Sequence, residues 1–167
     1  MGVEPLCVRC ARHTRTCCQG TDIYVTSGDV RRIGDYTGRR DFCEFRRPAN
    51  PEYADQNDDP LWQANVFRPD GSRRVLHRAV GGDCVFLGAN GCVLPMEARP
   101  LICRLYPYQY NEQQIFDEPA EGCPQALLLP GENLFDAVGM NLDAARQWHQ
   151  LLYWELRQET PQPCTLV

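Results

Sequence analysis

The sequence predicts an α+β fold, a single small domain with short β-hairpins, irregular cysteine-rich loops and a C-terminal helix. Three observations favour this class. The chain has 167 residues, about the size of one domain. Its alternating apolar stretches are short and are bounded by glycine, proline and asparagine, as in hairpins. The C-terminal stretch repeats its apolar residues at every third or fourth position, as an amphipathic helix does. We therefore expect residues 1–167 to form one domain.

The first 40 residues predict a loop followed by a short helix. Residues 1–20 are rich in cysteine and arginine and show little periodicity, which predicts an irregular loop. Residues 23–26 are a short extended segment. Ser27 is a typical helix N-cap and Gly38 a typical helix end, with apolar residues on one face between them. We expect a short helix between these two residues.

The middle of the chain predicts a surface loop and a β-hairpin. Residues 46–60 contain three prolines together with asparagine, aspartate and glutamine, a composition typical of loops. Two alternating segments follow, at residues 62–67 and 74–80, on either side of the turn Pro69-Asp70-Gly71. This arrangement predicts a hairpin closed by that turn.

Residues 84–116 predict two further hairpins with helical turns between them. Residues 84–87 and 92–94 are apolar and lie on either side of a glycine-containing turn at residues 88–91. Residues 95–106 predict helical turns interrupted at Pro100, and residues 108–116 predict another short hairpin.

The C-terminal helix is the clearest element, at about residues 141–158, with Asn141 as its N-cap. Its apolar residues predict a face that packs on the core: Leu142, Ala145, Trp148, Leu152 and Leu156.

The composition excludes several classes of function. The 17 basic residues are all arginine, so no lysine is present to form a Schiff base, a phosphate-binding loop or a general base. The net charge is −5 and the isoelectric point is about 5.2. Nucleic-acid-binding proteins usually have a basic face, so this acidic balance argues against a nucleic-acid partner. No GxSxG, HExxH, phosphate-loop or GxGxxG motif occurs, so the common hydrolase and nucleotide-binding classes gain no support.

The sequence also favours a reducing compartment. No apolar stretch approaches the roughly 20 residues that cross a bilayer. Arg9, Arg12 and Arg15 interrupt the apolar segment that a secretory signal would need. We therefore expect a cytoplasmic protein without a membrane partner, whose clustered cysteines bind a metal or take part in catalysis rather than forming disulfides.

Eight of the ten cysteines fall into two sets. A Cys-x2-Cys pair directs two thiolates inward from one turn, as zinc and iron–sulfur sites require. We predict that the eight are metal ligands, within residues 7–124, and that Cys43 and Cys164 are bystanders. The predicted ligands are Cys7, Cys10, Cys17 and Cys18 in the first set, and Cys84, Cys92, Cys103 and Cys123 in the second.

The spacing of Cys84 and Cys92 leaves two alternatives. If Asn90-Gly91 forms a regular turn, Cys92 pairs with Ala89, and Cys84 lies about five residues further along its strand. At about 3.3 Å per residue the two thiols are then roughly 16 Å apart, too far to share a metal. Either the segment is an irregular glycine-rich turn, or the two cysteines serve different sites.

The cysteine motifs resemble those of the YkgJ-type cysteine-cluster family, which is described as zinc- or iron-chelating. One departure is that six residues separate Cys10 from Cys17, where the family usually has two or three. The matching segments are the N-terminal Cys-x2-Cys with Cys17-Cys18, then Gly82–Leu87, Cys92, Arg99–Pro107 and Gly122–Pro124.

The resemblance implies metal chelation, and it leaves three functional hypotheses. The first is an iron–sulfur protein, with a 4Fe–4S cluster favoured and a second metal allowed, that transfers electrons or assists a partner protein or enzyme. The second is a zinc-stabilised interaction module without redox chemistry. The third is a metalloenzyme, by similarity to part of a flagellin lysine methylase, with no catalytic residue assigned. In each, Arg99 and Arg104 flank Cys103 and are predicted to neighbour the anionic cofactor.

Overall fold

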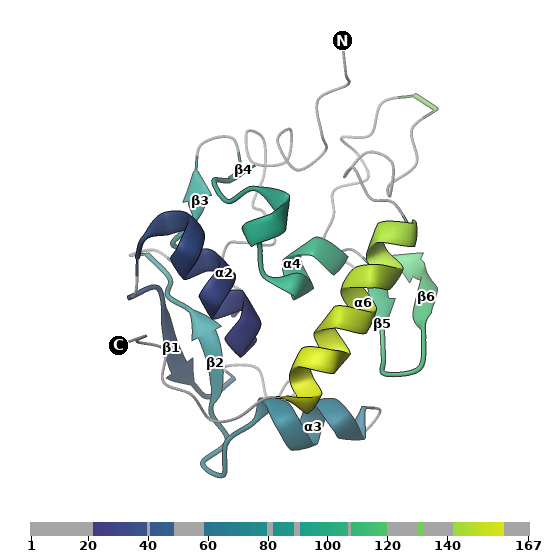
Figure 1. The fold of residues 1–167 in the computed structure, drawn as a ribbon, viewed down its shortest axis with the longest axis horizontal. Coiled ribbons are helices and arrows are strands. Elements are labelled where there is room, and N and C mark those ends of the chain that lie inside the picture. Colours follow the sequence, from purple (N-terminus) through teal and green to yellow (C-terminus); the bar gives the residue numbers. More distant parts are fainter. Residues whose placement is uncertain are drawn as a thin grey trace.

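The computed structural model describes residues 22–39, 41–48, 59–79, 82–88, 91–106, 108–119, 130–131 and 142–158. These residues form helices and short antiparallel strand pairs, which confirms the predicted α+β class (Figure 1). The elements are α2 (Ser27–Thr37), β1 (Cys43–Arg46), α3 (Pro60–Val66), β2 (Arg73–Leu76), β3 (Leu87–Gly88), β4 (Gly91–Cys92), the 3-10 helix η2 (Met96–Ala98), α4 (Leu101–Leu105), β5 (Tyr108–Tyr110), β6 (Ile115–Pro119) and α6 (Leu142–Arg157).

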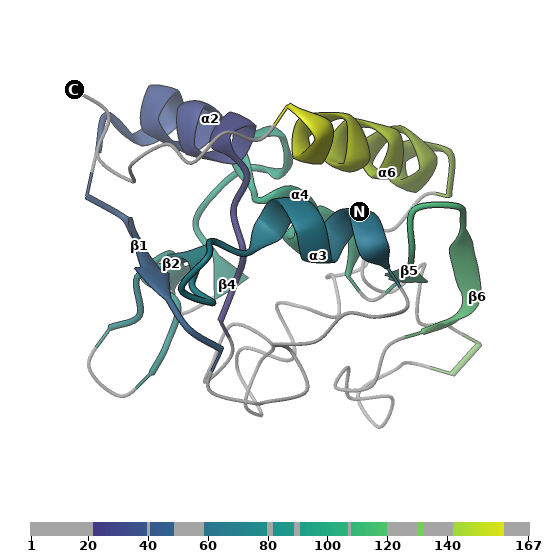
Figure 2. The same ribbon diagram turned by 90° about the horizontal axis from the view of Figure 1, so that it is seen from below.

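The described strands form three separate antiparallel pairs, β1 with β2, β3 with β4, and β5 with β6. In the first pair Cys43 lies opposite Leu76, and Tyr24 adds an isolated bridge to Val75. Helices α2 and α6 lie in one layer, and α3, α4 and the strand pairs lie beneath them (Figure 2). The hairpins predicted at residues 84–94 and 108–116 are therefore present, although their strands are short.

The prediction of a hairpin from residues 62–67 and 74–80 is wrong. Residues 60–66 form α3, because Asp59 caps it by accepting a hydrogen bond from the Trp62 amide at 3.2 Å and Pro60 occupies its first turn. The turn at residues 69–71 exists, with Gly71 at φ +84°, but it leads from a helix into β2. The partner of β2 is β1, nearly 30 residues earlier in the chain.

Helix α2 is confirmed, with a different N-cap. The cap is Thr26, whose hydroxyl accepts the Asp29 amide at 2.9 Å while the Asp29 carboxylate accepts the Thr26 amide at 3.0 Å. This reciprocal pair is a capping box. Gly38 ends the helix with φ +69°, as its sequence position predicted.

Two hydrophobic clusters form the core. The first joins α3, α4, β5 and α6, and the second joins the start of α2, β1, β2 and the segment before α4; Ile102 packs against both. The buried members of the first cluster are Tyr24, Val66, Leu101, Leu105, Tyr108, Ala145, Leu152, Tyr153 and Leu156. Those of the second are Ile23, Val25, Val30, Ile33, Phe42, Cys43, Leu76, Cys84, Phe86, Leu94 and Ala98.

The predicted apolar face of the C-terminal helix is confirmed over most of its length. Ala145, Leu152 and Leu156 of α6 are fully buried in the first cluster and Trp148 packs against it, whereas Leu142 is 42% exposed. The predicted cap Asn141 lies outside the described residues, as do the predicted loop at residues 1–20 and most of the loop at 46–60. Among the described helices, none is both long enough and apolar enough to span a bilayer.

Candidate metal centre

The structure describes three of the eight predicted ligands. Cys84 is buried and forms an isolated β-bridge with Arg78, Cys92 ends β4, and Cys103 lies within α4. The bystander Cys43 is buried in β1. The other predicted ligands, and the bystander Cys164, lie outside the described residues; these ligands are Cys7, Cys10, Cys17, Cys18 and Cys123.

Cys84 begins a tight turn that directs a backbone donor at its own sulfur. The Leu87 amide donates to the Cys84 carbonyl at 3.0 Å, which closes the turn. Within it, the Phe86 amide donates to Sγ of Cys84 at 3.5 Å. A hydrogen bond to sulfur stabilises the thiolate, and such bonds are one of the means by which proteins tune metal–sulfur centres. The turn therefore suits a metal-bound cysteine.

The register of the next hairpin corrects the separation expected from a regular turn. Cys92 lies opposite Leu87, and Gly88 opposite Gly91, so Cys92 does not pair with Ala89. The ends of a β-turn have Cα atoms less than about 7 Å apart, and paired residues about 5 Å. The Cα atoms of Cys84 and Cys92 are thus at most about 12 Å apart. The chain turns at residues 84–87 instead of continuing as a strand, so strand length does not hold these cysteines apart, and their assignment to one site or two stays open.

All three described ligands contact the second hydrophobic cluster. Cys84 is a member of it, and Cys92 and Cys103 pack against its edge. Thiolate donors select zinc and iron–sulfur centres, so the donor chemistry fits the predicted metals. No group of three metal-binding side chains converges within the part of the chain that the structure describes. The assignment of all eight cysteines as ligands stays a prediction.

Arg99 and Arg104 hold the turn that leads into α4. Nε of Arg99 donates to the Leu94 carbonyl at 2.8 Å, and the Arg104 guanidinium donates to the carbonyls of Arg99 and Glu97 at 2.9 and 2.6 Å. Burial, together with the charge of Arg32, lowers the pKa of Arg104. These bonds give both arginines a structural role beside Cys103, and their contact with a cofactor stays a prediction.

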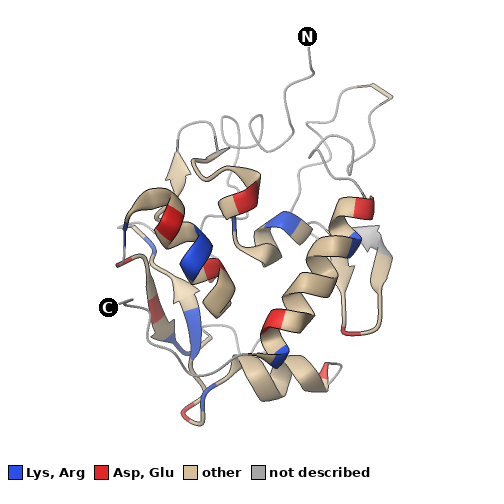
Figure 3. Cartoon of the chain, viewed as in Figure 1, with Lys and Arg blue, Asp and Glu red and all other residues tan. Residues whose placement is uncertain are grey.

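A buried charged cluster that the sequence did not reveal joins α2, α4 and α6. Arg32 bridges Asp29 at 2.7 Å and Glu155 at 2.8 Å, and both carboxylates are almost fully buried. Asp29 also accepts the Leu101 amide at 3.1 Å, and Glu155 accepts the Thr26 hydroxyl. Acidic and basic positions occur on both α2 and α6 (Figure 3). The capping box could have revealed Asp29, but no local signal points to Glu155.

The electrostatics of this cluster reflect its burial. Burial raises the pKa of Asp29, although Arg32 and the Thr26 amide act in the opposite direction. Burial would lower the pKa of Arg32, but its hydrogen bonds and charge interactions with Glu155 and Asp29 outweigh that effect and raise it. Arg32 therefore stays a cation in contact with both acids.

Aromatic side chains of β5 and α6 pack against one another. Burial raises the pKa of Tyr110, and the negative charge of Cys103 adds to the shift. The Tyr110 ring meets His149 edge-on, with ring centres 5.8 Å apart. The Tyr153 hydroxyl donates to Asp59 at 2.5 Å, and burial followed by this bond raises its pKa. These side chains connect β5 with α6, and α6 with the N-cap of α3.

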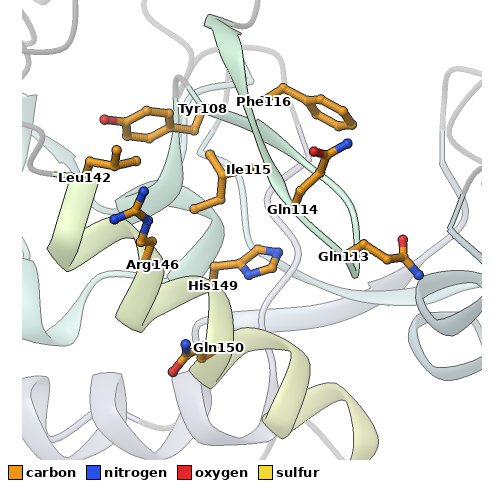
Figure 4. A pocket seen from close by; sticks show the side chains of 9 residues that line it. All are labelled: Tyr108, Gln113, Gln114, Ile115, Phe116, Leu142, Arg146, His149 and Gln150. Atoms are coloured by element: carbon orange, nitrogen blue, oxygen red, sulfur yellow. The ribbon is translucent and has the colours of Figure 1, made fainter.

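A groove of about 500 Å³ lies between the β5–β6 hairpin and α6 (Figure 4). Neither Cys103 nor Arg104 lines it, so it gives no support to a substrate pocket against the metal motif. Its lining residues are Tyr108, Gln113, Gln114, Ile115, Phe116, Leu142, Arg146, His149 and Gln150.

The described fold is a small α+β fold with thiol donors in a turn at Cys84, at the end of β4 and within α4, an arrangement compatible with the class of metal-chelating proteins. Residues 6–124, more than half of the chain, match the model of the family described as CxxCxxCC, a putative zinc- or iron-chelating domain. The chain belongs to this family, which confirms the resemblance of its cysteine motifs. Membership supports binding of zinc or iron. No curated protein and no solved structure matches the chain.

Proposed function

We propose that the clustered cysteines hold an iron–sulfur cluster, with the 4Fe–4S form favoured. Eight thiol donors exceed the four that one cluster needs, which leaves donors for a second metal. The cluster would supply one-electron chemistry, and the chain would transfer electrons or assist a partner enzyme. The hydrogen bond from the Phe86 amide to Sγ of Cys84 carries this proposal.

The surroundings of Cys84 support a redox centre. Cys84 is only 5% exposed and belongs to the second hydrophobic cluster, together with Phe86. Solvent exclusion and hydrogen bonds to sulfur set the reduction potential of an iron–sulfur cluster. Arg104 on α4, which carries Cys103, and Arg99 in the turn before it add positive charge near this cysteine, and such charge would offset part of that of thiolate-bound iron.

Metal and sulfide analysis of protein purified under argon tests the proposal. We expect brown protein with iron and acid-labile sulfide in equal amounts. Cys84→Ser should lose most of the iron, whereas Cys43→Ser should keep it. The two positions are a matched pair, since each residue is 5% exposed and each belongs to the second cluster.

Two outcomes would contradict the proposal. Colourless protein with stoichiometric zinc, unfolded by chelators, would establish the zinc-stabilised interaction module instead. Iron retained by Cys84→Ser as fully as by Cys43→Ser would show that the described motif does not hold the cluster.

A further inference from the structure

We propose that the buried cluster of Asp29, Arg32 and Glu155, here called the carboxylate clamp, positions the metal-binding helix α4. Asp29 and Glu155 are then positioning residues for Cys103. The inference rests on the proposed metal-binding function of that cysteine, and it adds residues that the cysteine motifs do not contain.

Asp29 ties the start of α4 to α2. One carboxylate oxygen, Oδ2, accepts the Thr26 amide at 3.0 Å, and the other, Oδ1, accepts the Leu101 amide at 3.1 Å. Leu101 is the first residue of α4, so its amide has no acceptor within the helix. Because Asp29 is 1% exposed and Leu101 is fully buried, solvent does not compete for this bond. Cys103 follows two residues later.

Glu155 closes the clamp from α6. Both of its oxygens accept from Arg32, at 2.8 and 3.0 Å, and Oε1 also accepts the Thr26 hydroxyl. The carboxylate lies so close to Gly28 that a β-carbon there would collide with it. Glu155 lies beyond residues 6–124, so a helix outside the family match completes the clamp.

Packing against α6, together with the hydrogen bond from Leu101 to Asp29, fixes the orientation of α4. Leu101 and Leu105 of α4 are fully buried against α6 residues such as Leu152 in the first cluster. The Arg104 side chain bonds back to the preceding turn. With one face packed and its first amide held, α4 presents Cys103 to the second cluster in one orientation. Groups that orient metal ligands typically contribute 10–100-fold to metal affinity.

Asp59 provides a matched control for a merely structural effect. It is also a buried acid, 6% exposed, that caps a helix and bonds to α6, through the Trp62 amide and the Tyr153 hydroxyl. These two bonds join α3 to α6, and neither involves α4. Substitution of either Asp29 or Asp59 should therefore lower the stability of the fold. Only substitution of Asp29 should also lower the affinity for metal.

The experiment measures binding of Co²⁺ to the full chain, using the thiolate-to-cobalt absorption band, at a temperature where every variant is folded. We expect Asp29→Ala to weaken binding about 10–100-fold and to change the band shape at saturation. Asp29→Asn keeps an acceptor for the Leu101 amide and should recover most of the affinity. Asp59→Ala should lower the unfolding midpoint with wild-type Co²⁺ affinity and spectrum. If Asp29→Ala does not fold, Glu155→Gln takes its place, with a smaller loss in the same direction.

The possible failures are distinguishable. A wild-type chain that carries no iron or zinc as purified and also binds no Co²⁺ would overturn the metal-binding function together with this inference. A wild-type chain that binds Co²⁺, with Asp29→Ala or its Glu155→Gln substitute unchanged in affinity and spectrum, would overturn the positioning role alone. So would an equal loss of affinity in Asp59→Ala.

Discussion

Gly28 sets the distance between α2 and α6. A β-carbon at this position would meet the carboxylate of Glu155, which Arg32 and Thr26 hold in place. Alanine normally stabilises a helix relative to glycine by about 1 kcal/mol. At position 28 the close approach of Glu155 requires the absence of a side chain. We therefore expect alanine to destabilise the protein here relative to glycine.

We predict that Gly28→Ala lowers the free energy of unfolding by about 2–4 kcal/mol, because displacing Glu155 leaves buried charges without their partners. Urea unfolding of the variant and the wild type measures the difference. Asp35→Ala, on an exposed position of the same helix, is the control and should change stability by less than about 0.5 kcal/mol. A stabilised Gly28→Ala protein would show that Glu155 does not pack there.

Asp29 should make stability depend on pH. Burial raises its pKa in the folded chain above the ordinary value of 3.8. As pH rises above about 4, the unfolded chain therefore ionises before the folded one, and the contribution of Asp29 is lost as pH passes through the raised pKa. The stability of wild type relative to Asp29→Asn should fall across this range. Urea unfolding of both proteins at a series of pH values measures the difference, and an increase with pH would contradict the prediction.

At the scale of single residues, the sequence predicted those features that depend on residues close together in the chain. Gly38 ends α2 in the left-handed backbone conformation, which glycine adopts readily, and the sequence predicted this helix end correctly. Glu155 could not be found in this way, since its partners Thr26 and Arg32 lie more than 120 residues earlier. An acid on an amphipathic helix is ordinarily solvated, and only the fold shows that this one is buried.

At the scale of elements, α3 shows how a cap can outweigh an alternating pattern. Residues 62–67 alternate, which favours a strand, yet Asp59 and Pro60 together begin a helix. The strand β2 then pairs with β1, a contact that no local turn specifies. By contrast, α6 was predictable because its 3.6-residue periodicity extends over four turns.

The cysteine motif was predictable as chemistry but not as geometry. Spacing identified Cys84, Cys92 and Cys103 as thiol donors, and the family match supports the metal. The turn at Cys84 depends on one backbone bond to Leu87 and on the pairing of Leu87 with Cys92. A shift of two residues in that register changes the separation of the thiols by several ångströms, which spacing alone cannot resolve.

At the scale of the whole molecule, metal should stabilise the two clusters unequally. The second cluster contains Cys84 and contacts Cys92 and Cys103, whereas the first is built from α3, α4, β5 and α6 without a predicted ligand among its buried members. A bound metal adds stability to the state that binds it. Local opening of the second cluster breaks the site directly, so this part should respond most to metal removal.

Amide hydrogen exchange with and without chelator measures this asymmetry. We predict that metal removal increases exchange at residues 84–94 by at least about tenfold, while the α6 amides near Leu152 and Leu156 stay protected. A tenfold change corresponds to about 1.4 kcal/mol of local stability. Leu152→Ala is the reciprocal control, because it removes a fully buried side chain from the first cluster and should cost about 2–5 kcal/mol with its largest effect on α6. Uniform exchange across both clusters after chelation would instead show that the chain unfolds as one unit when the metal leaves.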